Sequence, residues 1–197
     1  MKRICVFAGS NSGARGEYAA AARELGRALA RRQMGLVYGG ARVGLMGALA
    51  DAALSAGGHV IGVMPEALVA KEVGHRGLSE LRVVKSMHER KATMADLAEG
   101  FVALPGGWGT LDEFFEMLTW AQLGFHRKPC GLLNVHGYFD RLLAFVEHCV
   151  DEGFVRREHG SMISVSSSPT ALLDLLATYK APVVEKWIER AFPVRES

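Results

Sequence analysis

The sequence predicts a doubly wound α/β fold, in which a parallel sheet of about seven strands carries helices on both faces as a three-layer α/β/α domain. Short apolar runs alternate with longer stretches of helical periodicity along most of the chain. This alternation is typical of βαβ units, whose strands pair in parallel. The strand-like runs are apolar at nearly every position, as expected when helices cover both faces of a sheet. We therefore assign residues 1–179 to one domain and residues 180–197 to a C-terminal tail.

The first half of the chain gives three strands and two helices. The expected elements are a strand at 2–8, a helix at 16–32, a strand at 35–38, a helix at 44–55 and a strand at 59–65. Residues 66–80 are polar and show no strong period, so we expect an ordered loop that covers a site.

The second half continues the alternation. The expected elements are a strand at 81–84, a helix at 86–98, a strand at 100–104, a helix at 110–124, a strand at 130–134, a helix at 138–152, a strand at 162–165 and a helix at 168–179. Ser86 fits the N-cap of its helix, and Pro169 fits a first helical turn.

Three of the predicted strands end in loops rich in glycine or small polar residues, at residues 9–13, 39–47 and 105–110. In open parallel sheets, ligands bind outside the carboxyl ends of the strands. The convergence of three such loops at that edge predicts a Rossmann-like site for a phosphate or a nucleotide. The dinucleotide fingerprint Gly-x-Gly-x-x-Gly is absent, and the phosphate loop ending in Gly-Lys-Ser/Thr is absent too, which argues against an ATPase or a kinase.

The most informative stretch runs from Leu104 to Glu113. An apolar strand stops at Pro105, a glycine turn follows, and Thr110 opens a helix whose apolar positions 111, 114, 115 and 118 share one face. This arrangement predicts an anion site, because free backbone N–H groups and the positive end of the helix dipole point at one spot. The alternative for Thr110 and Glu113 is a capping box, in which both side chains satisfy backbone donors.

A second cluster, at residues 87–91, opens the helix before the fifth strand. Arg90 and Lys91 lie just beyond the carboxyl end of the fourth strand, so we expect them to reach the same crevice as the glycine turn. A planar guanidinium there would bind phosphate or ribose hydroxyls in fixed geometry. The alternative is the charged first turn of a solvent-facing helix.

Composition and motif spacing argue against several other classes of protein. The formal net charge of +2 gives no support for a nucleic-acid surface, and no stretch approaches membrane-spanning length. The apolar start is too short for a signal peptide. Three cysteines without Cys-x-x-Cys spacing indicate a cytoplasmic setting, and the seven histidines show no zinc-ligand spacing. We therefore expect no metal, no nucleic acid and no membrane partner.

Together these residues resemble the Lonely Guy family, the cytokinin riboside 5′-monophosphate phosphoribohydrolases. The family motif Pro-Gly-Gly-x-Gly-Thr-x-x-Glu is matched in full by residues 105–113. The other matching landmarks are Arg90-Lys91, Val-Tyr-Gly-Gly at 37–40, Gly-Leu-Met-Gly at 44–47, Thr-Trp-Ala-Gln-Leu-Gly at 119–124 and Gly-Leu-Leu-Asn at 131–134.

The resemblance implies hydrolysis of the N-glycosidic bond of a purine nucleoside 5′-monophosphate, either AMP or a cytokinin nucleotide with an N6-modified adenine, to free base and ribose 5-phosphate. It implies catalytic roles for Arg90 and Glu113, and no metal or redox cofactor. The resemblance and the loops together give these substrate-binding candidates: Gly9, Ser10, Gly39, Gly40, Glu72, Met87, Arg90, Lys91, Gly106, Gly107, Trp108, Gly109 and Thr110. The family is often labelled lysine decarboxylase, but nothing in the sequence marks a pyridoxal-phosphate lysine.

Two further expectations concern assembly and activity. The helix at 110–124 is apolar on more than one face, which indicates deep burial or a partner subunit, and the resemblance favours a homodimer. The rival function is a non-catalytic nucleotide sensor or carrier. Such a protein would use the same loops but would have no use for an acid aimed at the ribose.

Overall fold

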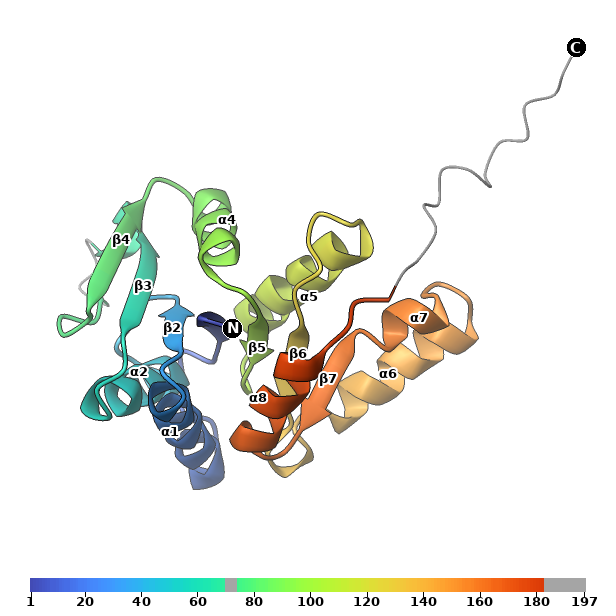
Figure 1. The fold of residues 1–197 in the computed structure, drawn as a ribbon, viewed down its shortest axis with the longest axis horizontal. Coiled ribbons are helices and arrows are strands. Elements are labelled where there is room, and N and C mark those ends of the chain that lie inside the picture. Colours follow the sequence, from blue (N-terminus) through green and yellow to red (C-terminus); the bar gives the residue numbers. More distant parts are fainter. Residues whose placement is uncertain (70–73, 183–197) are drawn as a thin grey trace, which may run out of the picture.

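The computed structural model describes residues 1–69 and 74–182 and confirms the doubly wound α/β fold (Figure 1). Seven described strands form one parallel sheet in the order β4-β3-β2-β1-β5-β6-β7. The strands are β1 (Arg3–Phe7), β2 (Gly35–Tyr38), β3 (Val60–Pro65), β4 (Glu80–Val84), β5 (Phe101–Ala103), β6 (Cys130–Leu133) and β7 (Ile163–Ser166). The helices are α1 (Gly16–Arg31), α2 (Gly44–Ser55), α3 (Glu66–Val69), α4 (Met87–Leu97), α5 (Trp108–Gln122), the 3₁₀ turn η1 (Val135–Gly137), α6 (Asp140–Asp151), α7 (Arg157–Gly160) and α8 (Pro169–Thr178).

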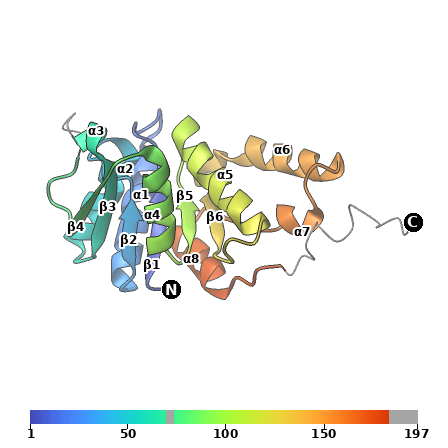
Figure 2. The ribbon, with the colours of Figure 1, turned by 90° about the horizontal axis from the view of Figure 1, so that it is seen from above.

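The core consists of two apolar layers, one on each face of the sheet. Side chains from α1, α2 and α8 pack on one face together with Ile4 and Val6 of β1. Side chains from α4 and α5 pack on the other face together with Cys5 and Phe7. Successive residues of a strand point to opposite faces, so a fully apolar strand serves both layers. Figure 2 shows α4 and α5 next to one another in front of the sheet.

Every predicted strand and helix is present, with ends within two residues of the predicted ones. Ser86 Oγ accepts from Glu89 N at 3.1 Å, which confirms the predicted N-cap of α4. The loop expected at 66–80 instead begins with the short helix α3, and Gly74 forms an isolated bridge with Ala41. Helix α7 and the turn η1 were not predicted. The division into a domain at 1–179 and a tail stays a prediction, because residues 183–197 lie outside the described part.

Strand β1 lies at the centre of the sheet, and the side on which later strands are added changes there. This strand pairs with β2 on one side and with β5 on the other, so Val6 lies between Tyr38 and Val102. The chain winds outward from β1 through β2, β3 and β4, and then returns to add β5, β6 and β7 on the opposite side. Loops that leave the carboxyl ends of β1 and β5 therefore turn to opposite faces of the sheet, which is the usual place for a ligand in such folds.

Candidate active site

The glycine turn after β5 (residues 105–109) is tied to the loop after β1. Gly9 N–H donates to the Pro105 carbonyl at 3.1 Å. A side chain at Gly106 would collide with Thr110 Oγ1 and would lie 3.0 Å from Gly9 N. Gly106 is therefore glycine because the turn folds against its own helix and against the neighbouring loop at once.

The three loops predicted to converge do meet around this turn. Gly9 O accepts from Leu45 N at 3.0 Å, which joins the loop after β1 to the start of α2. Gly44 has a φ of +60°, and a side chain there would collide with the backbone of Ser10. The sequence-based expectation that loops 9–13, 39–47 and 105–110 share one edge of the sheet is confirmed.

Helix α5 begins earlier than predicted. Its first residue is Trp108, its N-cap is Gly107, and no side chain caps it. Thr110 is consequently the third residue of the helix, and Glu113 lies in the second turn with 9% of its surface exposed. The capping-box alternative is wrong, because Gly107 holds the cap position and Glu113 pairs with an arginine instead.

The predicted apolar face of α5 is confirmed in part: Leu111 and Leu118 pack with Phe114 against the core, whereas Phe115 is 36% exposed. Of positions 111, 114, 115 and 118, only Phe114 is fully buried. The buried face consists of Thr110, Glu113, Phe114 and Met117. The most buried side of the helix is thus turned slightly from the predicted face, and it carries the Glu113 carboxylate.

A buried ion pair lies where α4 meets α5. Arg90 Nη1 stands 3.1 Å from Glu113 Oε1, and Arg90 Nε donates to the Val63 carbonyl at 3.0 Å. Both side chains are about nine-tenths buried. Burial raises the pKa of the Glu113 carboxyl, and the Arg90 guanidinium opposes that rise. The predicted catalytic residues are thus brought into direct contact, and the alternative of a solvent-facing charged turn for Arg90 is wrong.

Gly39 at the end of β2 makes room for this pair. A side chain at Gly39 would collide with Arg90 Nη2. Gly40 has a φ of +80° and packs against Met64. Gly39 therefore borders the arginine, and the chain needs glycine at this position because the Arg90 guanidinium occupies the space that a Cβ would take.

Lys91 forms a second connection between α4 and α5. Its ammonium lies 2.9 Å from Glu116 Oε2 and 3.3 Å from Asp112 Oδ2. Hydrogen bonding to Glu116, with a further contribution from Asp112, raises the pKa of Lys91. The described contacts of Lys91 join the helix of Arg90 to the helix of Glu113, and its predicted role in substrate binding stays a prediction. Met87 Sδ lies 3.9 Å from Arg90 Nη1, at the edge of the same cluster.

The remaining predicted residues differ in how much of them the protein covers. Ser10, Gly107 and Gly109 are exposed, and Trp108 is 89% exposed at the start of α5. A shallow apolar pocket runs from Trp108 along the outer side of α5. Glu72 lies outside the described residues.

Sequence reasoning missed Tyr138. Its hydroxyl donates to the Gly106 carbonyl at 2.6 Å, from the loop that follows β6. The residue carries no motif of its own. Its position after the sixth strand, at the same edge of the sheet as the glycine turn, was the available signal.

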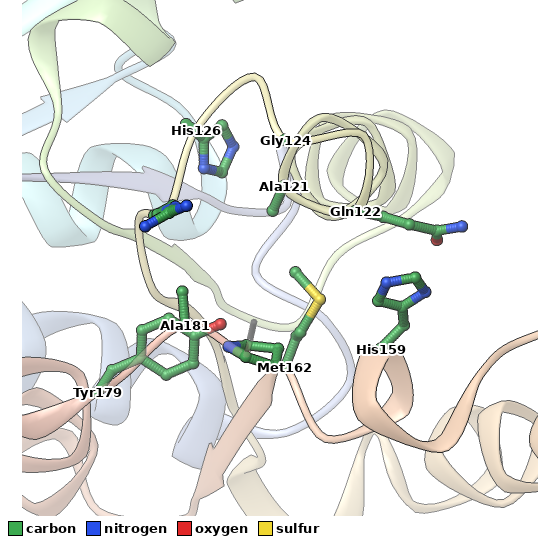
Figure 3. A pocket seen from close by; sticks show the side chains of 10 residues that line it. Ala121, Gln122, Gly124, His126, His159, Met162, Tyr179 and Ala181 are labelled. Carbon is green, nitrogen blue, oxygen red and sulfur yellow. The ribbon is translucent and has the colours of Figure 1, made fainter. Parts of the chain in front are cut away.

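A partly open pocket lies at the opposite end of α5, away from the glycine turn (Figure 3). It lies between the end of α5, helix α7 and residues 179–182, and His126 and His159 line it from different elements. None of the predicted site residues that the structure describes lines it. Residues 1–69 and 74–182 contain no cluster of three or more His, Cys, Asp or Glu side chains suited to a metal ion.

The fold and the site together define a Rossmann-like α/β protein with a glycine-rich turn beside a buried arginine–carboxylate pair. Residues 46–176 match the family model described as possible lysine decarboxylase. A protein of Oryza sativa subsp. japonica, named probable cytokinin riboside 5′-monophosphate phosphoribohydrolase LOGL9, is 52% identical over 91% of this chain and 79% of its own. The cytokinin riboside 5′-monophosphate phosphoribohydrolase of Rhodococcoides fascians is 55% identical over 78% of each chain. The chain belongs to the Lonely Guy family.

Solved structures with the same fold are more distant. The X-ray structure of TM1055 gives a TM-score of 0.70 at 22% identity and covers 91% of this chain and 100% of its own. The molybdenum cofactor binding protein of Rippkaea orientalis gives 0.69 at 22% identity, over 90% of this chain and 97% of its own. At this identity the likeness shows the fold alone. No described helix is long and apolar enough to cross a bilayer.

Proposed function

We propose that this protein hydrolyses the N-glycosidic bond of nucleoside 5′-monophosphates whose base is adenine or an N6-modified adenine, releasing free base and ribose 5-phosphate. The relatives named as cytokinin riboside 5′-monophosphate phosphoribohydrolases support the reaction. The observation that carries the proposal is the buried pair of Arg90 and Glu113, with Glu113 on the helix that the glycine turn opens. A sensor would not need to bury a carboxylate there against the cost of its desolvation.

Glu113 and Arg90 suit the chemistry of this bond. Cleavage builds positive charge on the ribose, as in other glycosidases that pass through oxocarbenium-like states. A carboxylate beside the sugar can stabilise that charge, hold the ribose hydroxyls or activate water. Burial disfavours the charged carboxylate, and Arg90 at 3.1 Å counteracts this effect, so the pair keeps a carboxylate available in an apolar setting.

The phosphate is assigned to the glycine turn and the start of α5. The first N–H groups of a helix lack intrahelical acceptors, and the helix dipole adds positive potential at the same place. Binding energy at the phosphate would orient the ribose against Glu113. Substrate contacts by Gly9, Ser10, Gly39, Gly40, Glu72, Met87, Lys91 and residues 106–110 belong to this proposal.

Lys91, the lysine next to Arg90, is not suited to Schiff-base chemistry. A lysine that forms a Schiff base with a cofactor or substrate needs a lowered pKa. Contacts with Glu116 and Asp112 raise the pKa of Lys91 instead. A carboxylate paired with arginine suits a glycosidic bond better than an amino-acid decarboxylation.

The deciding experiment is to incubate the purified protein with AMP and with N6-isopentenyl-AMP, and to follow release of the free base by chromatography. We expect base release from at least one of them, and the ratio of the two rates gives the substrate preference. Adenosine serves as the control, because it lacks the phosphate that the glycine turn would hold. Nucleotide binding without base release would favour the sensor, and equal cleavage of adenosine and AMP would contradict the phosphate assignment.

We also propose that the protein is a homodimer formed through α5 and α6. Helix α6 has one apolar face but no fully buried residue, and an apolar groove separates it from the outer side of α5. Phe115 and Phe145 line this groove with 36% and 60% of their surfaces exposed. Wide exposed apolar surfaces of this kind are typical of subunit interfaces.

Light scattering at micromolar concentration tests the dimer. We expect a dimer mass for the wild type and a monomer mass for Phe145→Glu. Leu175→Glu is the matched control, because Leu175 is 45% exposed on α8, on the other side of the sheet. A monomeric wild type would overturn the proposal.

Free cysteines, two of them buried, also accord with the proposed cytoplasmic location.

A further inference from the structure

Two neighbouring loops donate hydrogen bonds to carbonyl groups of the glycine turn. Gly9 N–H donates to the Pro105 carbonyl at 3.1 Å, and the Tyr138 hydroxyl donates to the Gly106 carbonyl at 2.6 Å. The two donors come from the loops after β1 and after β6. Together they fix two successive peptide groups of the turn.

Fixing a carbonyl also fixes the next N–H group. A peptide unit is planar, and in the trans form its C=O and N–H bonds point in opposite directions. The bond to Tyr138 therefore directs the Gly107 N–H away from Tyr138, and the bond from Gly9 directs the Gly106 N–H away from Gly9. A hydrogen bond at the carbonyl also polarises the peptide, which makes its N–H a stronger donor.

The Tyr138 ring is itself held in place. It packs edge-on against the rings of Phe139 and of Tyr18 in α1, with centroid distances of 4.9 Å and 5.7 Å. The loop behind it is braced by Asn134, whose side chain accepts from Phe139 N at 2.8 Å and donates to Asp140 at 2.7 Å. Tyr138 is 42% exposed, but these ring contacts and the bond to Gly106 hold its hydroxyl in one orientation.

We infer that Tyr138 is a positioning residue for the phosphate: its hydroxyl orients the Gly106–Gly107 peptide so that the turn presents its N–H groups to an anion. The inference rests on the proposed function, since it assumes that the turn binds the 5′-phosphate. Tyr138 acts through the backbone and does not touch the reacting atoms. Its loss should therefore weaken ligands that carry the phosphate and leave the binding of the free base intact.

The test is Tyr138→Phe, which removes one hydroxyl and keeps the ring. We expect the Kd for ribose 5-phosphate and the KM for AMP to rise about 3–10-fold, the usual effect of one neutral hydrogen bond. The Kd for adenine should stay within about twofold of the wild type, and kcat should fall by less than KM rises. Tyr18→Phe is the control, because its ring packs on Tyr138 and none of its described contacts reaches the glycine turn.

Calorimetry with adenine and with ribose 5-phosphate separates the outcomes. Unchanged binding of ribose 5-phosphate by the variant would overturn the inference, and so would an equal weakening of both ligands, which would indicate general distortion of the site. A wild-type protein that binds neither AMP nor ribose 5-phosphate would overturn the proposed function as well. That result differs from a normal wild type with an unaffected variant, which would overturn the role of Tyr138 alone.

Discussion

Glu113→Gln separates the catalytic role of this residue from its structural role. Glutamine keeps the length of the side chain, and its amide oxygen can still accept from Arg90 Nη1, which lies 3.1 Å from the carboxylate. Two effects on stability then oppose each other. Replacing the ion removes the desolvation cost that raises the pKa of Glu113, but it leaves the Arg90 charge without a counter-ion. We expect a net change within about 1 kcal/mol, or roughly 2–4 °C in Tm for a domain of this size.

The effect on turnover should be much larger than the effect on stability. A positioned acid or base contributes about 10²–10⁴-fold to the rate, which corresponds to roughly 2.7–5.4 kcal/mol of transition-state free energy. Nucleotide binding should persist, because the phosphate contacts are assigned to the glycine turn. By contrast, Glu113→Ala removes the acceptor as well and should destabilise the fold by about 3–5 kcal/mol, since a buried charge loses its partner.

Three measurements on the one variant decide the matter: Tm, AMP affinity and the rate of adenine release. Glu116→Gln is the matched control, since Glu116 lies one helical turn further along α5 and pairs with Lys91 instead of Arg90. A Glu113→Gln protein that folds, binds AMP and releases adenine within about tenfold of the wild-type rate would refute the catalytic role. The acid would then have to be sought at Glu72 or Asp112.

Three further predictions follow from the same contacts. Burial raises the pKa of Glu113, and catalysis requires its carboxylate to be ionised, so kcat should fall on acidification with a midpoint above pH 4.5, the ordinary pKa of glutamate. Glu113→Gln should abolish this fall. A rate that rises on acidification would contradict the prediction. The same raised pKa means that the wild type should lose stability relative to Glu113→Gln as the pH rises through it, which Tm measured across the acid range will show. Gly39→Ala should displace the Arg90 guanidinium and lower kcat at least about tenfold. The control is Gly57→Ala, at a position with open space around it, which should alter Tm alone. Equal rates for the two variants would refute the role of Gly39.

Much of the fold and of the site could be predicted from local patterns. The apolar runs gave the strands, and Ser86 and Pro169 marked helix starts that the structure contains. Glycine-rich loops after three strands were expected to meet, because the carboxyl ends of parallel strands share one edge. Arg90 and Glu113 were assigned to one site for the same reason together with the family motif.

Local patterns failed where two alternatives looked alike along the chain. Thr110 and Glu113 have the spacing of a capping box, but the helix begins at Trp108 and the cap is Gly107. Periodicity placed Phe115 on the same apolar face of α5 as Phe114, but Phe115 is 36% exposed and lines the groove toward α6.

The sequence by itself determined the order of the elements, the doubly wound class and the edge of the sheet that carries the site, because periodicity, glycine placement and the handedness of βαβ units act locally. Only the tertiary structure decided that Arg90 meets Glu113, that Lys91 joins α4 to α5, and that Tyr138 holds the glycine turn. These contacts link residues that are 21 to 32 positions apart along the chain. They depend on the strand order, which places α4 and α5 on one face of the sheet and the loop after β6 next to β5. A local sequence pattern does not encode contacts between residues so far apart along the chain.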